Sequence, residues 1–347
     1  MSKKSITKYV SSFSRKRGKK MGATILILGL LVVLAFPVSI QARDRLVVGY
    51  TAITGIKAGL WVAKEGGIFE KYGFTGDLVF ISTGSKMVQA MLGGEVPFAG
   101  AGGIAAVSAT LAGGDFVMLG ALAKVPAFYI MALPEIKSIE GLRGKAVGVA
   151  RFGSATDFAM RYVLRKHGLE PERDVKLIQT GDVFAGAAAM ANRLIVAAPF
   201  SSPANLRAQE IGAHVLVNMG KAGVYFPHDA WMARRSFVNA NEDLVRRFIK
   251  AYSEGVYRLF TDKELGRRAI QRFTRATDSK VVDAVYQYAL DYVEKIPYNT
   301  REGIQEILNQ LAVTNPKAKT ANPDSFYDDR FVKELEASGF FAQFWGK

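Results

Sequence analysis

Short apolar runs alternate along most of the chain with stretches in which apolar residues recur at helical spacing. A short apolar run fits a buried strand, whereas recurrence every three to four residues fits an amphipathic helix. The predicted strands are residues 46–50, 78–81, 96–100, 116–119, 145–150, 175–179, 194–198 and 214–218. The predicted helices between them are residues 57–65, 85–92, 104–111, 157–166, 180–191 and 204–211. This alternation predicts an α/β fold with doubly wound sheets.

After residue 233 the pattern changes to long helices with no strand pattern between them. We expect these helices at residues 242–260, 263–275, 279–295, 301–311 and 328–338. Asn239 with Glu242, and Thr261 with Glu264, have the spacing of N-terminal capping residues. The aromatic residues of these helices recur with the helical period, so we assign them to packing.

The order strand, short polar loop and helix occurs in two separate parts of the chain, which predicts two lobes. Residues 51–54 follow the first strand, and residues 151–156 hold the same place after the strand at 145–150. In an open α/β sheet such loops face the ligand crevice. Segments rich in β-forming residues, 124–133 and 225–233, are interpreted as crossings between the lobes. We predict a clamshell in which residues 43–133 and 225–347 form lobe 1 and residues 134–224 form lobe 2.

The loops after the predicted strands supply the candidate ligand contacts. In the first lobe these are Thr51, Ile53, Ser85, Ala101 and Gly102. In the second lobe they are Arg151, Phe152, Ser154, Ala155 and Thr156, with Phe200 as a lid. Several helices begin in these loops, and the N–H groups at helix N-termini favour an anion.

Three of these candidates have alternative interpretations. The guanidinium of Arg151 could pair with a carboxylate or sulfonate through two hydrogen bonds, or it could serve in a surface ion pair. Ser154 and Thr156 could cap the helix at 157–166, a role that is compatible with ligand binding.

The residues that enzymes use are sparse. The chain has no cysteine, and its histidines are His167, His214 and His228. His228 is followed by Asp229, which makes this the one pair to test as an acid–base couple, with a structural histidine as the alternative. A P-loop, a Ser nucleophile elbow and zinc-ligand spacing are all absent from the sequence. We therefore expect no catalytic residue, metal ligand or cofactor.

The first 42 residues have the composition of a secretory signal peptide. The chain of 347 residues carries a net charge of +15, and residues 1–42 hold eight basic residues and no acid, which leaves +7 on the rest. An apolar run at residues 21–37 follows these cations, and cleavage after Ala42 is predicted. An uncleaved membrane anchor through residues 21–38 remains the alternative. The mildly basic body disfavours a nucleic-acid partner.

Four phrases of the sequence resemble one protein family. They are residues 46–74 (LVVGYTAITGIKAGLWVAKEGGIFEKYGF), 138–149 (SIEGLRGKAVGV), 168–175 (GLEPERDV) and 325–340 (SFYDDRFVKELEASGF). Together they are similar to the periplasmic solute-binding proteins of ABC importers of the nitrate, sulfonate and taurine family. The chain departs from the family pattern at Asn192, where glycine is usual, and at Val196, where aspartate is usual, which puts ligand identity in doubt.

The resemblance implies a type II periplasmic binding protein with a ligand cleft between two lobes. It implies an exported, non-enzymatic, monomeric receptor that captures a small, anionic organic solute of the sulfonate, nitrate or carboxylate type. Its partner would be the membrane permease of an ABC importer. The same fold also resembles enzymes that act on pyrimidine or other heterocycle precursors, which is the alternative function.

Overall fold

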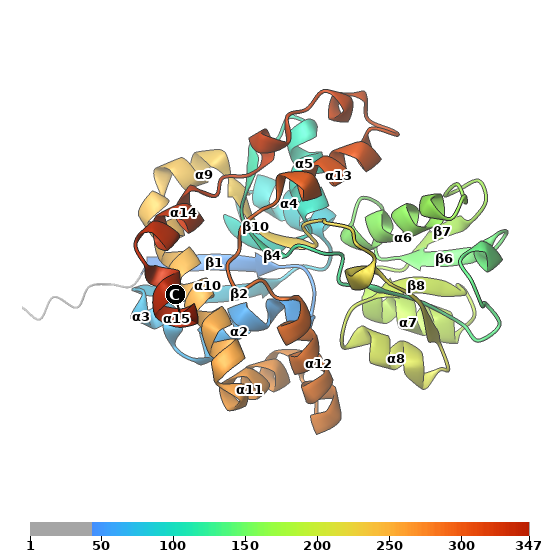
Figure 1. The fold of residues 1–347 in the computed structure, drawn as a ribbon, viewed down its shortest axis with the longest axis horizontal. Helices are drawn as coiled ribbons and strands as arrows, with labels where there is room; N and C mark the ends of the chain where they lie inside the picture. Colours follow the sequence, from blue (N-terminus) through green and yellow to red (C-terminus); the bar gives the residue numbers. More distant parts are fainter. Residues whose placement is uncertain (1–43, 347) are drawn as a thin grey trace, which may run out of the picture. The chain divides into compact units, whose positions relative to one another are not determined.

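A computed structural model describes residues 44–346, which form two five-stranded sheets covered by helices (Figure 1). The strands are β1 (Asp44–Tyr50), β2 (Phe74–Phe80), β3 (Phe98–Ala101), β4 (Phe116–Ala123), β5 (Tyr129–Ala132), β6 (Ala146–Val149), β7 (Lys176–Gln179), β8 (Ala197–Phe200), β9 (His214–Asn218) and β10 (Asp229–Arg234). All eight predicted strands are present. β2 begins four residues earlier than predicted, and β4 continues four residues further.

Each sheet contains parallel strands and one antiparallel strand that pairs on both its sides. The first sheet has the order β2-β1-β3-β10-β4, in which β1 is parallel to β2 and β3, and β10 is antiparallel to β3 and β4. The second sheet has the order β7-β6-β8-β5-β9, in which β6 is parallel to β7 and β8, and β5 is antiparallel to β8 and β9. The chain therefore forms two α/β lobes, one around each sheet.

The two crossings differ from the segments predicted for them. β5 follows the first crossing and belongs to the second sheet, so residues 129–132 lie in the second lobe and not in lobe 1, where they were expected. β10 follows the return crossing and belongs to the first sheet. The β-forming residues of both segments thus form the antiparallel strands, and residues 124–128 and 219–228 connect the two sheets.

Helices cover both faces of each sheet. They are α2 (Ala58–Glu65), α3 (Ile68–Lys71), α4 (Gly84–Leu92), α5 (Gly103–Leu111), α6 (Ala155–Lys166), α7 (Val183–Ala191), α8 (Ala204–Glu210), α9 (Arg235–Ala240), α10 (Glu242–Thr261), α11 (Lys263–Thr274), α12 (Ser279–Tyr292), α13 (Arg301–Leu311), α14 (Arg330–Ala337) and α15 (Phe340–Trp345). The short helices α3, α9 and α15 were not predicted, because six residues or fewer give too little periodicity.

Both predicted capping pairs after residue 233 are wrong. Asn241, and not Asn239, precedes α10, and its side chain makes no capping hydrogen bond. Asp262, and not Thr261, caps α11, because its carboxylate accepts a hydrogen bond from the backbone N–H of Leu265. Asp262 was overlooked because Thr261 has a glutamate three residues later, which suits the capping-box pattern.

Separate apolar cores lie on the two faces of each sheet. In the first lobe one core joins β1 to α2, α10, α11 and α12, and a second joins β3 to α4, α5 and α13. In the second lobe one core involves α6 and the other α7 and α8. Trp61 and Trp231 are fully buried in the first of these cores.

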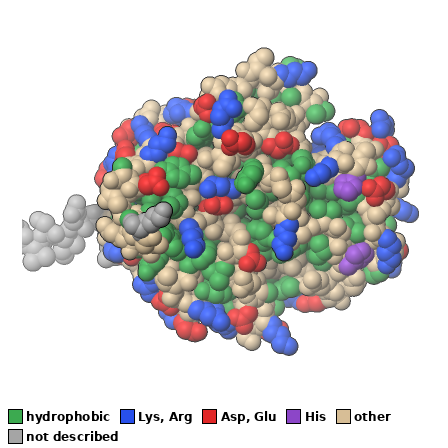
Figure 2. Space-filling model, in the orientation of Figure 1, with side chains coloured by type: hydrophobic (Ala, Val, Ile, Leu, Met, Phe, Trp, Pro, Cys, Tyr) green, Lys and Arg blue, Asp and Glu red, His purple; other side chains and the backbone are tan. Residues whose placement is uncertain are grey.

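Charged side chains of both signs are intermixed on the face shown in Figure 2. Within residues 44–346, no helix combines the length and apolar character needed to cross a bilayer. The predicted signal peptide, residues 1–42, lies outside the described residues.

Candidate functional site

A cavity of about 150 Å³ lies at the carboxyl ends of strands from both sheets. From the first lobe it is lined by Thr51, Ala52, Ile53, Thr54, Phe80, Thr83, Gly84, Gly102, Ile104 and Ala105. From the second lobe it is lined by Ala150, Ser154, Ala155, Thr156, Asp182, Val183, Phe184 and Ser201. Phe128, His228 and Asp229 line it from the crossings and the start of β10. Ligands of open α/β sheets bind at this end of the strands.

Six of the residues predicted to contact a ligand lie together in this lining. They are Thr51, Ile53, Gly102, Ser154, Ala155 and Thr156. The loops after β1 and β6, which the sequence predicted as walls of the crevice, therefore face one cavity. Contact with a ligand stays a prediction for all six.

The other five predicted residues lie outside the lining. They are Ser85, Ala101, Arg151, Phe152 and Phe200. Ala101 and Phe200 end strands β3 and β8 and are fully buried. The interpretation of Phe200 as a lid is wrong, because its ring is enclosed in the core formed with α7 and α8. Ser85 lies in the first turn of α4, where its Oγ is 3.4 Å from Oγ1 of Thr83.

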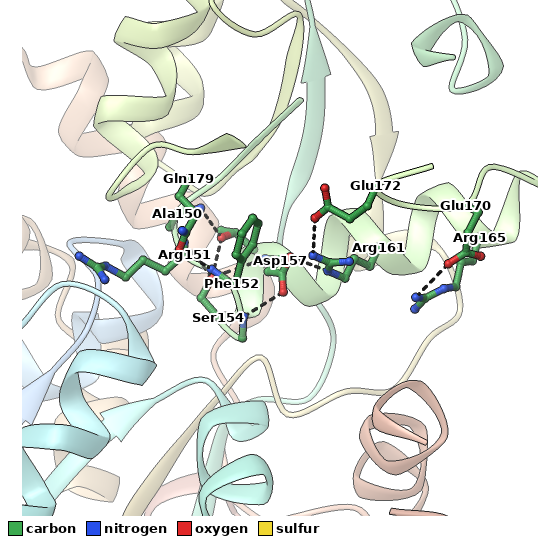
Figure 3. Close-up of polar contacts among 12 residues, drawn as sticks. Ala150, Arg151, Phe152, Ser154, Asp157, Arg161, Arg165, Glu170, Glu172 and Gln179 are labelled. Carbon is green, nitrogen blue, oxygen red and sulfur yellow. Dashed lines mark hydrogen bonds and ion pairs between the residues drawn. The ribbon is translucent and has the colours of Figure 1, made fainter. Parts of the chain in front are cut away.

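The loop between β6 and α6 is held in place by a chain of polar contacts (Figure 3). The backbone N–H of Gly153 donates to Oδ2 of Asp157 at 2.9 Å, and Nε of Arg161 donates to Oδ1 of the same carboxylate at 2.7 Å. Arg161 also pairs with Glu172 at 3.0 Å. Its guanidinium lies 5.5 Å from the ring centroid of the exposed Phe152. Phe152 therefore covers this network and does not line the cavity.

Arg151 lies apart from both the cavity lining and the ion pairs of the described residues. Its side chain is exposed and extends away from the contacts around Asp157 (Figure 3). Among residues 44–346 it forms no ion pair, and it does not line the cavity. The expected pairing of this guanidinium with an anion in the cavity is therefore not supported by the geometry.

Four helices begin at the cavity, but their N-termini differ. Ser154 caps α6 by accepting a hydrogen bond from the N–H of Asp157, and Asp182 caps α7 by accepting one from Ala185. α4 and α5 begin after Thr83 and Gly102, which make no side-chain capping bond. The first N–H of α5, that of Gly103, donates to the carbonyl of Pro227, so the start of α4 is the better candidate to bind an oxygen-rich group of a ligand.

Thr83 has φ of 78°, an uncommon value for a residue with a Cβ. Its N–H donates to the carbonyl of Thr51 at 3.3 Å, which ties the loop after β1 to the start of α4. Two hydroxyl-bearing residues of the lining are thereby fixed relative to each other.

A buried ion pair lies next to the cavity, and sequence reasoning missed it. Nζ of Lys57 lies 2.5 Å from Oδ1 of Asp229, and both side chains are buried. Burial lowers the pKa of Lys57 and raises that of Asp229, while the attraction between them acts in the opposite direction on each. The available signal was a lysine directly before the apolar helix at 58–65, with no polar neighbour to keep it at the surface.

His228 and Asp229 do not form the acid–base couple that the sequence suggested for testing. Nδ1 of His228 accepts a hydrogen bond from the backbone N–H of Ala127 at 3.1 Å, whereas Asp229 pairs with Lys57. Burial, and then the charge of Lys57, lower the pKa of His228 from 6.5 to about 3. The imidazole is therefore neutral at physiological pH.

The lining combines apolar walls with hydroxyl groups. Ile53, Phe80, Ile104, Phe128 and Phe184 supply most of the large apolar side chains. Thr54 lines the same cavity, and its hydroxyl, in a side chain that is 1% exposed, has no hydrogen-bond partner among the described residues. Residues 44–346 contain no group of three or more potential ligands that could hold a metal ion.

The sequence was compared with protein families and with known proteins. The family model described as NMT1/THI5 like matches residues 56–264. A putative binding protein, YtlA of Bacillus subtilis, is 26% identical over 199 residues, which are 56% of this chain. The chain spans only about 60% of the length of that relative.

Solved structures share the fold of the whole described region. The periplasmic aliphatic sulphonate-binding protein SsuA of Escherichia coli has a TM-score of 0.66 at 18% identity, covering 86% of this chain and 99% of that one. The periplasmic nitrate-binding protein NrtA of Synechocystis has 0.66 at 15% identity, covering 85% and 89%. The desulfurization enzyme DszB has 0.62 at 16% identity, covering 85% and 99%. Likeness at these identities establishes a common fold, which both binding proteins and an enzyme use.

Proposed function

The chain belongs to the NMT1/THI5-like family, and from this premise we propose that it is the solute-binding component of an ABC importer. It captures a small organic solute between its lobes and delivers it to a membrane permease. The observation that carries the proposal is that one cavity is lined by residues of both lobes, which only two short crossings connect. Such an arrangement permits closure by hinge motion.

Direct contacts join the two lobes beside the cavity, which supports a closed form. The N–H of Gly55, in the first lobe, donates to the carbonyl of Ser202, in the second lobe, at 3.3 Å. The rings of Phe158 in α6 and Phe226 in the return crossing stack with centroids 4.2 Å apart. A ligand stabilises such a form only if it makes better contacts there than in the open form.

The solute class follows from the size and walls of the cavity. A volume of about 150 Å³ with large apolar side chains favours an organic molecule of about one ring over nitrate alone. The start of α4 is the proposed place for a carboxylate or sulfonate group, because it has no side-chain cap and Thr83 and Gly84 line the cavity. We keep an anionic organic solute as the proposed class, with the anion at α4 and not at Arg151.

The proposed place of action is the periplasm, reached through the signal peptide in residues 1–42. Mass spectrometry of the protein from the periplasmic fraction tests this, because cleavage after Ala42 gives a chain that begins at Arg43. A chain that keeps residues 21–38 and remains with membranes would support the anchored alternative.

A thermal-shift screen of the purified protein tests the receptor function. The compounds are sulfonates, carboxylates, nitrate and pyrimidines, and saturation at 100 times the dissociation constant adds about 2.7 kcal/mol of stability. A raised melting temperature with unchanged compound supports a receptor. The alternative is an enzyme acting on a heterocycle precursor, favoured only by the fold shared with DszB. Turnover that is lost in His228→Asn would support the enzyme instead.

A further inference from the structure

His228 and Asp229 are adjacent in the chain, and both line the cavity although each is at most 5% exposed. Consecutive residues of a regular strand point to opposite faces of the sheet. Here His228 precedes β10, and the register of β10 against β4 shifts between Asp229 and Ala230. This irregular start is consistent with the place of both residues in the lining of one cavity.

The histidine presents a hydrogen-bond donor. Its Nδ1 accepts from the N–H of Ala127, so in the neutral ring the proton lies on Nε2. The ring is fixed by Phe128, whose centroid is 4.4 Å away. Burial and the nearby Lys57 keep the pKa of His228 at about 3, so the ring stays in this neutral form. Among the hydrogen bonds of residues 44–346, none engages Nε2.

The aspartate presents a hydrogen-bond acceptor. Oδ1 is occupied by Nζ of Lys57, which also balances the charge of the carboxylate. No hydrogen bond recorded for the described part of the chain engages Oδ2. A carboxylate oxygen that has no protein donor is available to a ligand, and a hydrogen bond to a charged group is among the stronger ones.

We propose that the solute carries an amide-type edge, in which its N–H donates to Oδ2 of Asp229 and its adjacent carbonyl oxygen accepts from Nε2 of His228. This inference rests on the proposed function, since it names the chemistry of the solute that the receptor captures. Lactams, imides and ring amides such as pyridones carry this edge, and an acidic substituent on the same molecule would be the anionic group proposed for the start of α4. Simple sulfonates, carboxylates and nitrate lack the edge. A site built from polar groups rejects analogues that leave those groups unpaired.

The rest of the cavity suits a flat ring that carries such an edge. Phe80 and Phe184 come from opposite lobes, line the cavity and are also partly exposed at 42% and 37%, so they lie at its rim. Phe128 lies deeper, at 4% exposure, beside His228. Aromatic rings on these walls favour stacking with a planar ligand.

Matched pairs of compounds test the edge on the unmodified protein. Isothermal titration compares 2-pyridone, 2-pyrrolidone, succinimide and uracil with their N-methyl analogues, and with benzoate, benzenesulfonate and nitrate. We expect at least one amide-type compound to bind, and its N-methylation at the edge to weaken binding by at least about tenfold, because a hydrogen bond to a charged group is lost.

Replacing the acceptor oxygen of Asp229 with a hydrogen-bond donor tests the role of this residue. In Asp229→Asn the amide oxygen still accepts from Lys57, but an NH₂ group replaces Oδ2 and faces the N–H of the ligand. We expect the preference for the N–H compound over its N-methyl analogue to fall by at least about tenfold. Asp77→Asn, at an exposed position of β2, serves as the matched control and should keep the preference.

The outcomes separate this inference from the proposed function. Binding of an amide-type compound that tolerates N-methylation, or binding of benzoate or benzenesulfonate alone, overturns the inference and leaves the receptor function standing. Absence of binding by every compound overturns the inference, and failure of the wider screen as well would overturn the receptor. If Asp229→Asn does not fold, the comparison of N–H and N-methyl compounds on the unmodified protein still decides.

Discussion

Gly102, before α5, and Ala155, at the start of α6, lie against each other although they belong to different lobes. A Cβ atom added to Gly102 would lie 3.1 Å from Cβ of Ala155 and 3.4 Å from the carbonyl oxygen of His228. Both residues line the cavity. The absence of a side chain at residue 102 therefore allows the starts of two helices to approach each other across the site.

Gly102→Val is expected to prevent this approach, because the larger side chain has no room between the helix starts. Ligand binding should weaken by at least about tenfold, a loss of about 1.4 kcal/mol. The fold of each lobe should persist, since the contact lies between lobes. Titration calorimetry with the compound found in the screen measures the loss, and circular dichroism checks the fold. Gly141→Val is the control, because a Cβ there meets only ordinary contacts near 3.8 Å. Unchanged affinity in Gly102→Val would contradict the closed form.

Lys57→Met is expected to destabilise the protein by about 3–5 kcal/mol, because Asp229 is left buried and unpaired. Urea unfolding at pH 7 measures this. The double variant Lys57→Met with Asp229→Leu should recover most of the loss, since neither charge remains. The control is Arg45→Met, which breaks the exposed pair with Asp77 and should cost less than about 1 kcal/mol. Equal effects of the two single variants would show that the Lys57 pair is solvated.

His228 gives stability a defined pH dependence. Its pKa is about 3 in the folded protein and 6.5 as the ordinary value, so the unfolded chain binds a proton between these limits and the folded protein does not. The free energy of unfolding should therefore fall as the pH falls from 6.5 towards 3, by up to about 1.4 kcal/mol per pH unit from this group, and reach its full value above 6.5.

Urea unfolding at pH 7.5 and 5.0 measures the effect of His228. The variant His228→Asn should lose less stability than the unmodified protein on acidification, because it lacks this proton uptake. Lys57 and Asp229 titrate in both proteins, so the comparison cancels their contribution. His214→Asn, in β9 and away from the cavity, controls for removing a histidine. The same acid loss in His228→Asn and the unmodified protein would disprove the assignment.

Arg151→Ala and Ser154→Ala distinguish the observed site from the one predicted. Arg151 is exposed and outside the lining, so its removal should change ligand affinity by less than about threefold. Ser154→Ala removes the cap of α6 and should cost about 1 kcal/mol of stability, along with weaker binding. Calorimetry and thermal unfolding of both variants give the two readouts. A large loss of affinity in Arg151→Ala would restore the guanidinium as the anion contact.

The sequence alone determined the order of the elements and the loops that meet at the site. Strands of four to eight residues and helices of seven or more have a period that local spacing reveals, and parallel strands bring their following loops to one edge. This is why Thr51, Ile53, Ser154 and Thr156 could be named as neighbours before any contact was known. The resemblance to periplasmic solute-binding proteins was likewise present in local phrases of the sequence.

Only the tertiary structure decided which side chains the cavity receives. Lys57 and Asp229 are separated by 172 residues and meet through the packing of η1 (Gly55–Lys57) under the first sheet, which no local pattern encodes. Phe200 was expected to follow a strand end as Ile53 does, yet it lies in a core because β8 continues two residues past its expected end. Local periodicity fixes the type of each element, whereas burial and long-range pairing fix the direction of each side chain.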